Sequence, residues 1–383
     1  MTDKKLDIIE EIDGDEQTGV ELERQVDEAE ESDVIRPWDP TTIRVDTKPY
    51  SLRNIVDMIK EGDLELAPDF QRKKVWGPVQ KSRLIESILL RIPLPAFYFS
   101  SDEQGLLQVV DGLQRLSTIN DFVTGKFVLS GLEYLQSEVG GKRFEKLPTI
   151  WSRRVYSTQI IANVVDPQTP DQVKFDIFKR INTGGSPLNA QEIRHCMSKK
   201  KSRDFIQRLV SRTEFQLATS AKLQNHPRMV DREVVLRFVA FRSNRDQYGK
   251  FDTLDSFLTD ITKQIDSGKL NDQQLMQLES DFSRAMENAR RLFGDHAFRK
   301  WDNHTQRLNP FNRALFDTWS VLLADYQWEQ LKDHKSEIVT SSRQLMTANF
   351  VFLNAITTST NMASRINARF SAINRILEEN APK

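Results

Sequence analysis

The hydrophobic pattern of this chain changes once, near residue 188, and the change limits the architectures open to it. Up to that point, short β-branched or aromatic runs alternate with amphipathic segments of helical period. From residue 189 to residue 383 only the helical period occurs. Alternating strands and helices build a mixed sheet covered by helices, whereas uninterrupted helices build a bundle. The sequence therefore predicts an α+β protein, in which a small mixed-sheet domain is followed by an all-helical domain.

Turn residues such as Gly62, Pro93 and Pro95 separate the elements of the first domain. Asn189 and Glu192 form a capping-box pattern that starts the helical part. The expected strands cover 43–45, 64–66, 96–99, 106–110 and 158–165, the helices of the first domain cover 51–62, 78–92, 116–125 and 171–181, and the helical part covers 189–213, 230–243, 252–266, 271–293, 310–327 and 343–379.

Charge divides the chain a second time. Residues 1–33 carry fourteen acidic and three basic side chains, a net charge of −11, so the other 350 residues carry +10 within a total of −1. Such an acidic block is typical of a disordered tail, because it cannot bury enough apolar surface. It is either a solvating tail or an arm that competes with nucleic acid for the basic body. The expected domains are therefore 1–33, 34–188 and 189–383.

Composition excludes several classes of protein. The single cysteine, Cys196, rules out a disulfide framework and a four-cysteine zinc site. The five histidines lack the paired spacing of a zinc centre. No apolar run is long enough to span a membrane, and the acidic N-terminus lacks the apolar region of a secretory signal. We therefore expect a cytoplasmic protein with no membrane partner.

The segment Asp111-Gly112-Leu113-Gln114-Arg115 follows a predicted strand and opens a predicted helix. A strand that turns into a helix in this way exposes backbone N–H groups at the helix start, which is where anions bind. Arg115 then provides a fork for phosphate oxygens, and Gln114 positions a water or a base edge. The alternative is an ordinary turn, in which Asp111 caps the helix and Arg115 is solvated.

A second stretch, residues 70–76, places three cations between Phe70 and Trp76. Aromatic rings suit stacking on a base and cations suit its phosphates, so this pattern is typical of nucleic-acid binding. The alternative is a basic surface loop whose two aromatic side chains fill the core.

A third stretch ends the predicted helix 171–181. Lys179 and Arg180 lie in its last turn, and Gly184 and Gly185 follow it. Glycines let a backbone approach a phosphate closely. The alternative is a glycine C-cap with cations favourably placed near the helix C-terminus.

Taken together, these stretches resemble one family. They occur in the order found in the GmrSD-type restriction-endonuclease N-terminal domain, and two later segments resemble its helical continuation. The segments that carry the resemblance are 68–76, 92–95, 109–118, 178–192, 231–238 and 311–316.

The resemblance implies a ParB/sulfiredoxin-like core followed by helices, in a bacterial anti-phage protein that binds and hydrolyses nucleoside triphosphates. It also implies that hydrolysis regulates DNA recognition or cleavage. Carried over by position, the catalytic residues are Asp111, Gln114 and Arg115, and the nucleotide- or phosphate-binding residues are Gln71, Arg72, Gly112, Thr118, Lys179, Arg180, Asn182, Gly184 and Gly185.

Two departures from the family pattern stand out. Position 113 is leucine where the family usually has glutamine, which removes one polar group from the motif. The segment 330–383 also lacks the His and Asn pattern of the family's C-terminal His-metal nuclease domain. Cleavage of DNA would then require a partner protein or would not occur.

Two functions follow as hypotheses. In the first, the chain hydrolyses a nucleoside triphosphate, GTP or ATP, and contacts DNA: Arg115 and Arg72 stabilise phosphate charge, Gln114 orients the water, and Asp111 holds the turn or a Mg²⁺. In the second, the chain is a non-catalytic DNA-binding sensor or adaptor that recruits a separate nuclease or another defence-system protein. Both hypotheses are compatible with an oligomeric protein.

Overall fold

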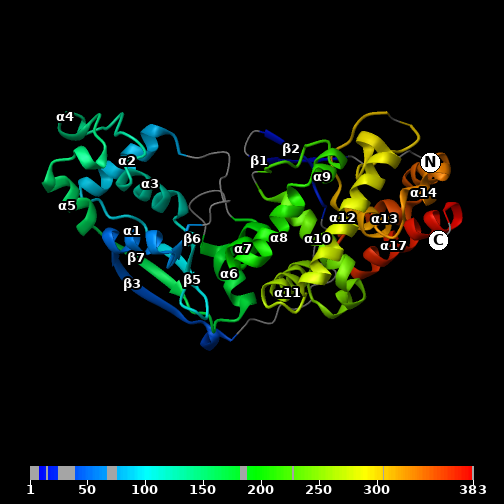
Figure 1. Ribbon diagram of the computed structural model, residues 1–383, viewed down its shortest axis with the longest axis horizontal. Helices are drawn as coiled ribbons and strands as arrows, with labels where there is room; N and C mark the ends of the chain where they lie inside the picture. The colour runs from blue at the N-terminus through cyan, green and yellow to red at the C-terminus, as the bar shows by residue number, and fades with distance from the viewer. Residues whose placement is uncertain are drawn as a thin grey trace. The chain divides into compact units, whose positions relative to one another are not determined.

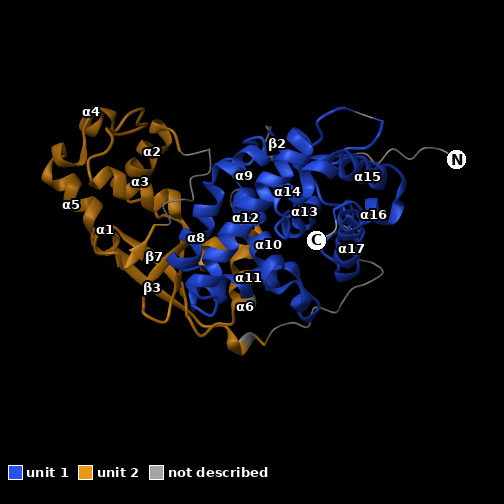
Figure 2. Cartoon of the chain, turned by 45° about the vertical axis from the view of Figure 1, so that its right-hand side comes forward, with its two compact units in different colours: residues 1–35, 198–383 blue, residues 36–197 orange. Residues whose placement is uncertain are grey.

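The computed structural model describes residues 8–13, 16–24, 39–66, 76–181, 188–226, 228–304 and 306–381. The chain divides into two compact units, which are coloured separately in Figure 2. Residues 36–197 form the sheet unit, and residues 1–35 together with 198–383 form the helical unit.

The sheet unit is built on five strands in the order β3-β7-β5-β6-β4 (Figure 1). β3 is antiparallel to β7, β5 is parallel to β7 and antiparallel to β6, and β4 is parallel to β6, so the sheet is mixed. This confirms the α+β class. The strands are β3 (Val45–Ser51), β4 (Leu64–Glu65), β5 (Phe97–Ser101), β6 (Leu107–Asp111) and β7 (Gln159–Val165).

Alternate residues of these strands face two apolar clusters, because successive side chains of a strand point to opposite faces. Val109 and Val164 pack against α1, α2, α3 and α5, and their neighbours Val110 and Val165 pack against α6 and α7. The helices of this unit are α1 (Leu52–Glu61), α2 (Pro78–Leu89), α3 (Leu113–Val123), α4 (Gln136–Val139), α5 (Thr149–Ser157), α6 (Asp171–Ile181) and α7 (Ala190–Met197), with short 3-10 turns at Pro40–Thr42 and Phe144–Lys146.

The helical unit surrounds one continuous apolar cluster that α8 to α17 share. Its α-helices are α8 (Lys200–Val210), α9 (Thr213–Ala218), α10 (Val230–Asn244), α11 (Leu254–Asp266), α12 (Asp272–Phe293), α13 (Arg313–Leu323), α14 (Trp328–Leu331), α15 (Lys335–Ala348), α16 (Phe350–Ala355) and α17 (Ala363–Asn380), and its 3-10 helices are η3 (Arg245–Lys250), η4 (Gly294–His296) and η5 (Lys332–His334).

Two helices expected from the sequence are broken. The expected helix 189–213 divides into α7, α8 and the start of α9, because the Asp266 carboxylate accepts the backbone N–H groups of Lys199 and Ser202 and so caps a new helix. The expected helix 343–379 breaks at Asn349, whose side chain caps α16, and again before α17. The capping box of Asn189 and Glu192 is confirmed, with both reciprocal bonds formed.

The expectation of a disordered tail over residues 1–33 is wrong for the residues there that the structure describes. β1 (Glu10–Asp13) and β2 (Glu16–Glu21) form an antiparallel hairpin within the helical unit. The backbone N–H of Glu21 donates to the carbonyl of Phe311, the N–H of Phe311 donates to Gly19, and Val20 is fully buried. The composition of this segment does not predict the hairpin, because its acidic side chains form ion pairs with cations about 290 residues away in the sequence.

Those acidic side chains bind buried cations of the helical unit. The Lys300 ammonium lies 2.6 Å from Glu21 Oε1, and the Arg313 guanidinium lies 2.7 Å from Glu11 Oε1. Burial lowers the pKa of Lys300, and Glu21 opposes that shift. Burial likewise opposes ionisation of Arg313, but the surrounding carboxylates outweigh it and raise its pKa. The hairpin therefore supplies charge that the helices lack.

Replacing Glu21 with alanine leaves the Lys300 ammonium buried opposite an apolar side chain. Breaking one side of a buried ion pair costs about 3 kcal/mol, so we expect the free energy of unfolding to fall by about that amount. Urea denaturation measures it. Glu379→Ala, which removes an exposed carboxylate at the end of α17, is the control. Equal stability of both variants would mean that the hairpin is not held by this pair.

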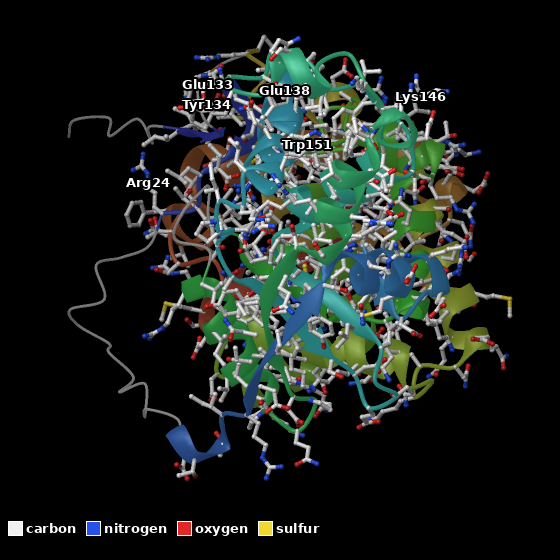
Figure 3. All side chains as sticks on the ribbon, turned by 90° about the vertical axis from the view of Figure 1, so that its left-hand side faces the viewer. Arg24, Glu133, Tyr134, Glu138, Lys146 and Trp151 are labelled. Carbon is white, nitrogen blue, oxygen red and sulfur yellow. The ribbon has the colours of Figure 1, made fainter. Side chains whose placement is uncertain are left out.

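In the sheet unit, the carboxylate of Glu86 holds a loop in place. It accepts the backbone N–H groups of Glu133, Tyr134 and Leu135 at 3.0, 2.7 and 2.8 Å. Burial opposes ionisation of Glu86, but these donors outweigh it and hold its pKa below the usual value. Tyr134 is thereby fixed in place while 71% exposed (Figure 3).

The lowered pKa of Glu86 predicts a dependence of stability on pH. The stabilisation is present above the unfolded-state pKa of about 4.5 and is lost as the pH falls through the lower folded-state pKa. Glu86→Gln leaves buried N–H groups poorly paired, and we expect it to cost about 2 kcal/mol at neutral pH. We therefore expect the difference in melting temperature between wild type and variant to become smaller as the pH is lowered from 7 to 3. A constant difference would contradict the assignment.

Candidate functional site

The turn between β6 and α3 is fixed by a glycine. β6 ends at Asp111, Gly112 has φ +97°, and α3 begins at Leu113. A Cβ placed on Gly112 would lie 2.3 Å from Cδ1 of Phe97, far closer than two carbons approach. Both the left-handed backbone and the ring of Phe97 therefore require glycine at this position.

Arg115 closes this turn from inside α3. Its Nη2 lies 2.9 Å from Asp111 Oδ2 and donates to the Ala96 carbonyl at 3.3 Å, and its Nη1 donates to Pro95. The guanidinium carbon also lies 4.2 Å from the centre of the Phe97 ring. The side chain of Arg115 is only 14% exposed, and this burial lowers its pKa although Asp111 opposes the shift. Asp111 and Arg115 thus form a partly buried ion pair at the start of the helix.

The remaining residues around the turn are half-buried or buried. The N-cap residue of α3 is Gly112, which has no side chain to cap the first turn, and the start of a helix is where anions bind. Leu113 packs against the apolar cluster that α1 to α3 share. Gln114 is half-buried, and Thr118 is 1% exposed, inside the sheet unit. The leucine that departs from the family pattern therefore has a packing role.

Lys179 and Arg180 are exposed in the last turn of α6. α6 and α7 pack on β6 through Val110, the residue that precedes Asp111. Within the described part of the chain, neither cation makes a hydrogen bond or ion pair with the β6–α3 turn. Their convergence on one site with Arg115 stays a prediction.

The two other stretches are described only in part. Trp76 is half-buried and packs on the same apolar cluster as Leu113, as its alternative interpretation expected. The other predicted site residues of these stretches lie outside the described residues: Phe70, Gln71, Arg72, Asn182, Gly184 and Gly185.

Sequence reasoning missed the partners of Arg115 at the start of β5. Pro95 and Ala96 supply carbonyl acceptors, and Phe97 supplies the ring beneath the guanidinium. Proline favours an extended backbone for the residue before it, so Pro93 and Pro95 were a usable signal for exposed carbonyl groups here.

Among the described residues, no group of three or more His, Cys, Asp or Glu side chains is arranged to hold a metal ion. In the same residues, no helix is both long and apolar enough to cross a membrane.

Comparison with known proteins identifies the sheet unit. Residues 52–199 match the family described as GmrSD restriction endonuclease, N-terminal domain. Residues 52–199 are thus similar to the N-terminal domain of GmrSD restriction endonucleases, and this similarity indicates a restriction-like defence protein. No curated protein and no solved structure matches the chain.

Gly112→Ala tests the geometry of the turn. The variant places a methyl group against Phe97 in addition to straining the backbone, so we expect it to lose about 3 kcal/mol of stability. Gly105→Ala is a matched control, since Gly105 has φ +86° but nothing within 4 Å of an added Cβ. It should lose about 1 kcal/mol. Denaturant unfolding that gives equal losses would exclude the close approach of Phe97.

Proposed function

We propose that the sheet unit binds and hydrolyses a nucleoside triphosphate at the β6–α3 turn and that this activity is coupled to DNA recognition in antiviral defence. The observation that carries the proposal is the Asp111–Arg115 pair at a helix start whose N-cap residue is Gly112, within a domain similar to the GmrSD N-terminal domain. Preorganised cations and backbone N–H groups stabilise the charge that develops in phosphoryl transfer.

Each residue of the turn has a role in this proposal. The first-turn N–H groups of α3 bind phosphate oxygens, and Gly112 allows the close approach because it has no side chain. Arg115 exchanges part of its bonding to Asp111 for the phosphates. Asp111 is then available to a Mg²⁺ ion that accompanies the nucleotide, and Gln114 orients the attacking water.

The nucleotide is GTP or ATP, and DNA is the regulatory partner. Exposed cations such as Lys179, Arg180 and Lys200 are suitable contacts for phosphates. The ParB-like character of the sheet unit belongs to the same proposal.

A second candidate is a non-catalytic DNA sensor or adaptor that recruits a nuclease. Two observations favour it: Arg115 is engaged by Asp111 and by two carbonyl groups, and Leu113 lies against the core where the family pattern has a polar residue. In this function the turn is a rigid structural element, and the exposed cations bind DNA without hydrolysis.

Release of phosphate from each of the four ribonucleotides, with and without DNA, tests the first candidate. We expect Arg115→Ala to reduce the rate about 100-fold or more, since it removes a donor aimed at the transferred group. Arg83→Ala removes an exposed arginine whose carboxylate partner lies 3.8 Å away, and it should leave the rate unchanged.

Arg115→Ala also removes the bonds that hold the turn, so thermal unfolding and Gln114→Ala accompany it. A folded Arg115→Ala protein that retains full hydrolysis would exclude the assignment. Absence of hydrolysis in the wild type, with DNA binding retained, would support the sensor. Hydrolysis gained by Leu113→Gln would then show that the leucine disables the motif.

A further inference from the structure

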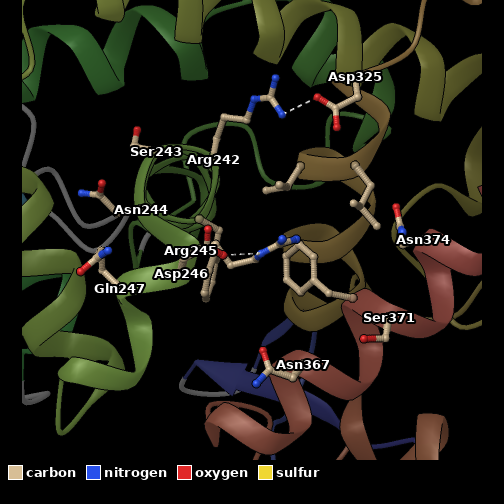
Figure 4. Close-up of a pocket in the computed structure, with 14 residues that line it drawn as sticks. Arg242, Ser243, Asn244, Arg245, Asp246, Gln247, Asp325, Asn367, Ser371 and Asn374 are labelled. Atoms are coloured by element: carbon tan, nitrogen blue, oxygen red, sulfur yellow. Dashed lines mark hydrogen bonds and ion pairs between the residues drawn. The ribbon is translucent and has the colours of Figure 1, made fainter. Parts of the chain in front are cut away.

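The helical unit contains a groove that the proposed function does not use. It has a volume of about 500 Å³, within the range of small-ligand pockets, and lies between the end of α10 with η3 on one side and α17 on the other (Figure 4). Its floor is apolar, with Phe241, Val321 and Leu322 from α10 and α13.

One end of the groove carries a stacked pair. The guanidinium of Arg245 lies 4.9 Å from the centre of the Phe370 ring, and Phe370 itself is buried beneath it. The side chain of Arg245 is 41% exposed, so it remains partly open to solvent. An exposed guanidinium plane supported by a ring is a surface on which a flat π-system stacks.

Amides and hydroxyls line the walls. Asn367, Ser371 and Asn374 are spaced by four and three residues, so they share one face of α17, and Asn244 contributes from the opposite wall. Asn374 already donates to Glu378 at 2.7 Å and Asn244 to Gln264 at 3.4 Å, so each of these amides keeps an oxygen acceptor and one N–H for a ligand. The groove can therefore recognise a group whose edge carries donors and acceptors in a fixed pattern.

The charges of the lining cancel. Arg242 is held by Asp325 at 2.7 Å and by Asp281 at 2.9 Å, and Arg245 lies 3.8 Å from Asp246. Two arginines and two aspartates thus line the groove itself. A triphosphate gains little from such a neutral surface, whereas an uncharged planar group with a hydrogen-bonding edge fits it.

We propose that this groove binds an unstacked nucleobase of a DNA strand. The base stacks on the guanidinium of Arg245, and the amides of Asn367 and Asn244 bond to its edge. Sugars usually pack on an exposed aromatic face, and the ring of Phe370 is covered by Arg245, which disfavours a carbohydrate. This inference rests on the DNA-recognition part of the proposed function. It adds that the recognised DNA contains an unstacked base.

Fluorescence anisotropy with the full chain tests it, using a labelled duplex with one unpaired base, the fully paired duplex, and an eight-nucleotide single strand. We expect the wild type to prefer the two DNAs with unstacked bases. Arg245→Ala should weaken their binding about tenfold, the usual effect of losing one stacking partner. Arg245→Lys should weaken it similarly, because lysine keeps the charge and loses the plane.

Arg208→Ala is the matched control, since Arg208 is also an exposed arginine over a phenylalanine ring, at 5.5 Å from Phe205 on α8. It should leave the preference for unpaired bases unchanged. Asn367→Leu, on an exposed position, tests the amide without removing a charge. It should weaken binding of the unpaired base, and unchanged binding would overturn the role of the amide.

Three results would overturn the proposal: equal affinity for paired and unpaired duplexes, wild-type affinity in Arg245→Lys, or binding of free nucleosides without binding of the strand. The last result would replace DNA by a free nucleoside as the source of the base. Phosphate release by the same variants separates the two proposals. If the wild type does not hydrolyse nucleotides but binds unpaired bases in a way that depends on Arg245, the triphosphatase proposal is refuted and the base-binding proposal is supported.

Discussion

The helical unit depends on one buried carboxylate that is shared by two arginines. Asp317 accepts two hydrogen bonds from Arg237, at 2.9 and 2.7 Å, and one from Arg369 at 2.9 Å, with all three side chains inside the core. Burial opposes the charge on Arg237, but Asp317 and Glu23 outweigh it and raise its pKa. One carboxylate cannot balance two guanidinium groups, so further acids are needed. Glu233 from α10 and Glu23 from the N-terminal segment supply them, at 3.2 and 3.8 Å from Arg237.

Local patterns in the sequence predicted local structure well. The helix 171–181 and the capping box of Asn189 and Glu192 were both predicted, because period and capping depend on neighbours in the chain. The N-terminal hairpin was not predicted, because Glu21 is satisfied by Lys300 and Asn312, which lie nearly 300 residues away. An acidic block has no local signal that distinguishes solvent from buried cations as its partner.

The same distinction applies to the candidate site. The sequence identified the turn of Asp111 and Arg115, since a strand, a glycine and a helix follow one another directly. It could not show that Arg115 would lie over Phe97, because that contact depends on how β5 pairs with β6. The groove beside α17 could not be predicted from the sequence for a similar reason, because its two walls are more than 100 residues apart in the chain. Its polar face of Asn367, Ser371 and Asn374 resembles any solvated helix surface until the opposite wall is known.

The docking of the hairpin also has a consequence for the order in which the protein folds. β2 and Arg24 bond to the backbone at Phe311 and at Thr357–Ser359, so this early segment completes a unit whose other parts are synthesised about 300 residues later. The sheet unit, residues 36–197, is thus an insertion within the helical unit. During synthesis all residues of the sheet unit are present before the helical unit is complete. The N-terminal segment, in contrast, can pack only after its partners near residues 311 and 357 have been made. A shortened chain that begins after the hairpin would expose Lys300 and Arg313, so its helices would carry uncompensated charge from the moment they fold.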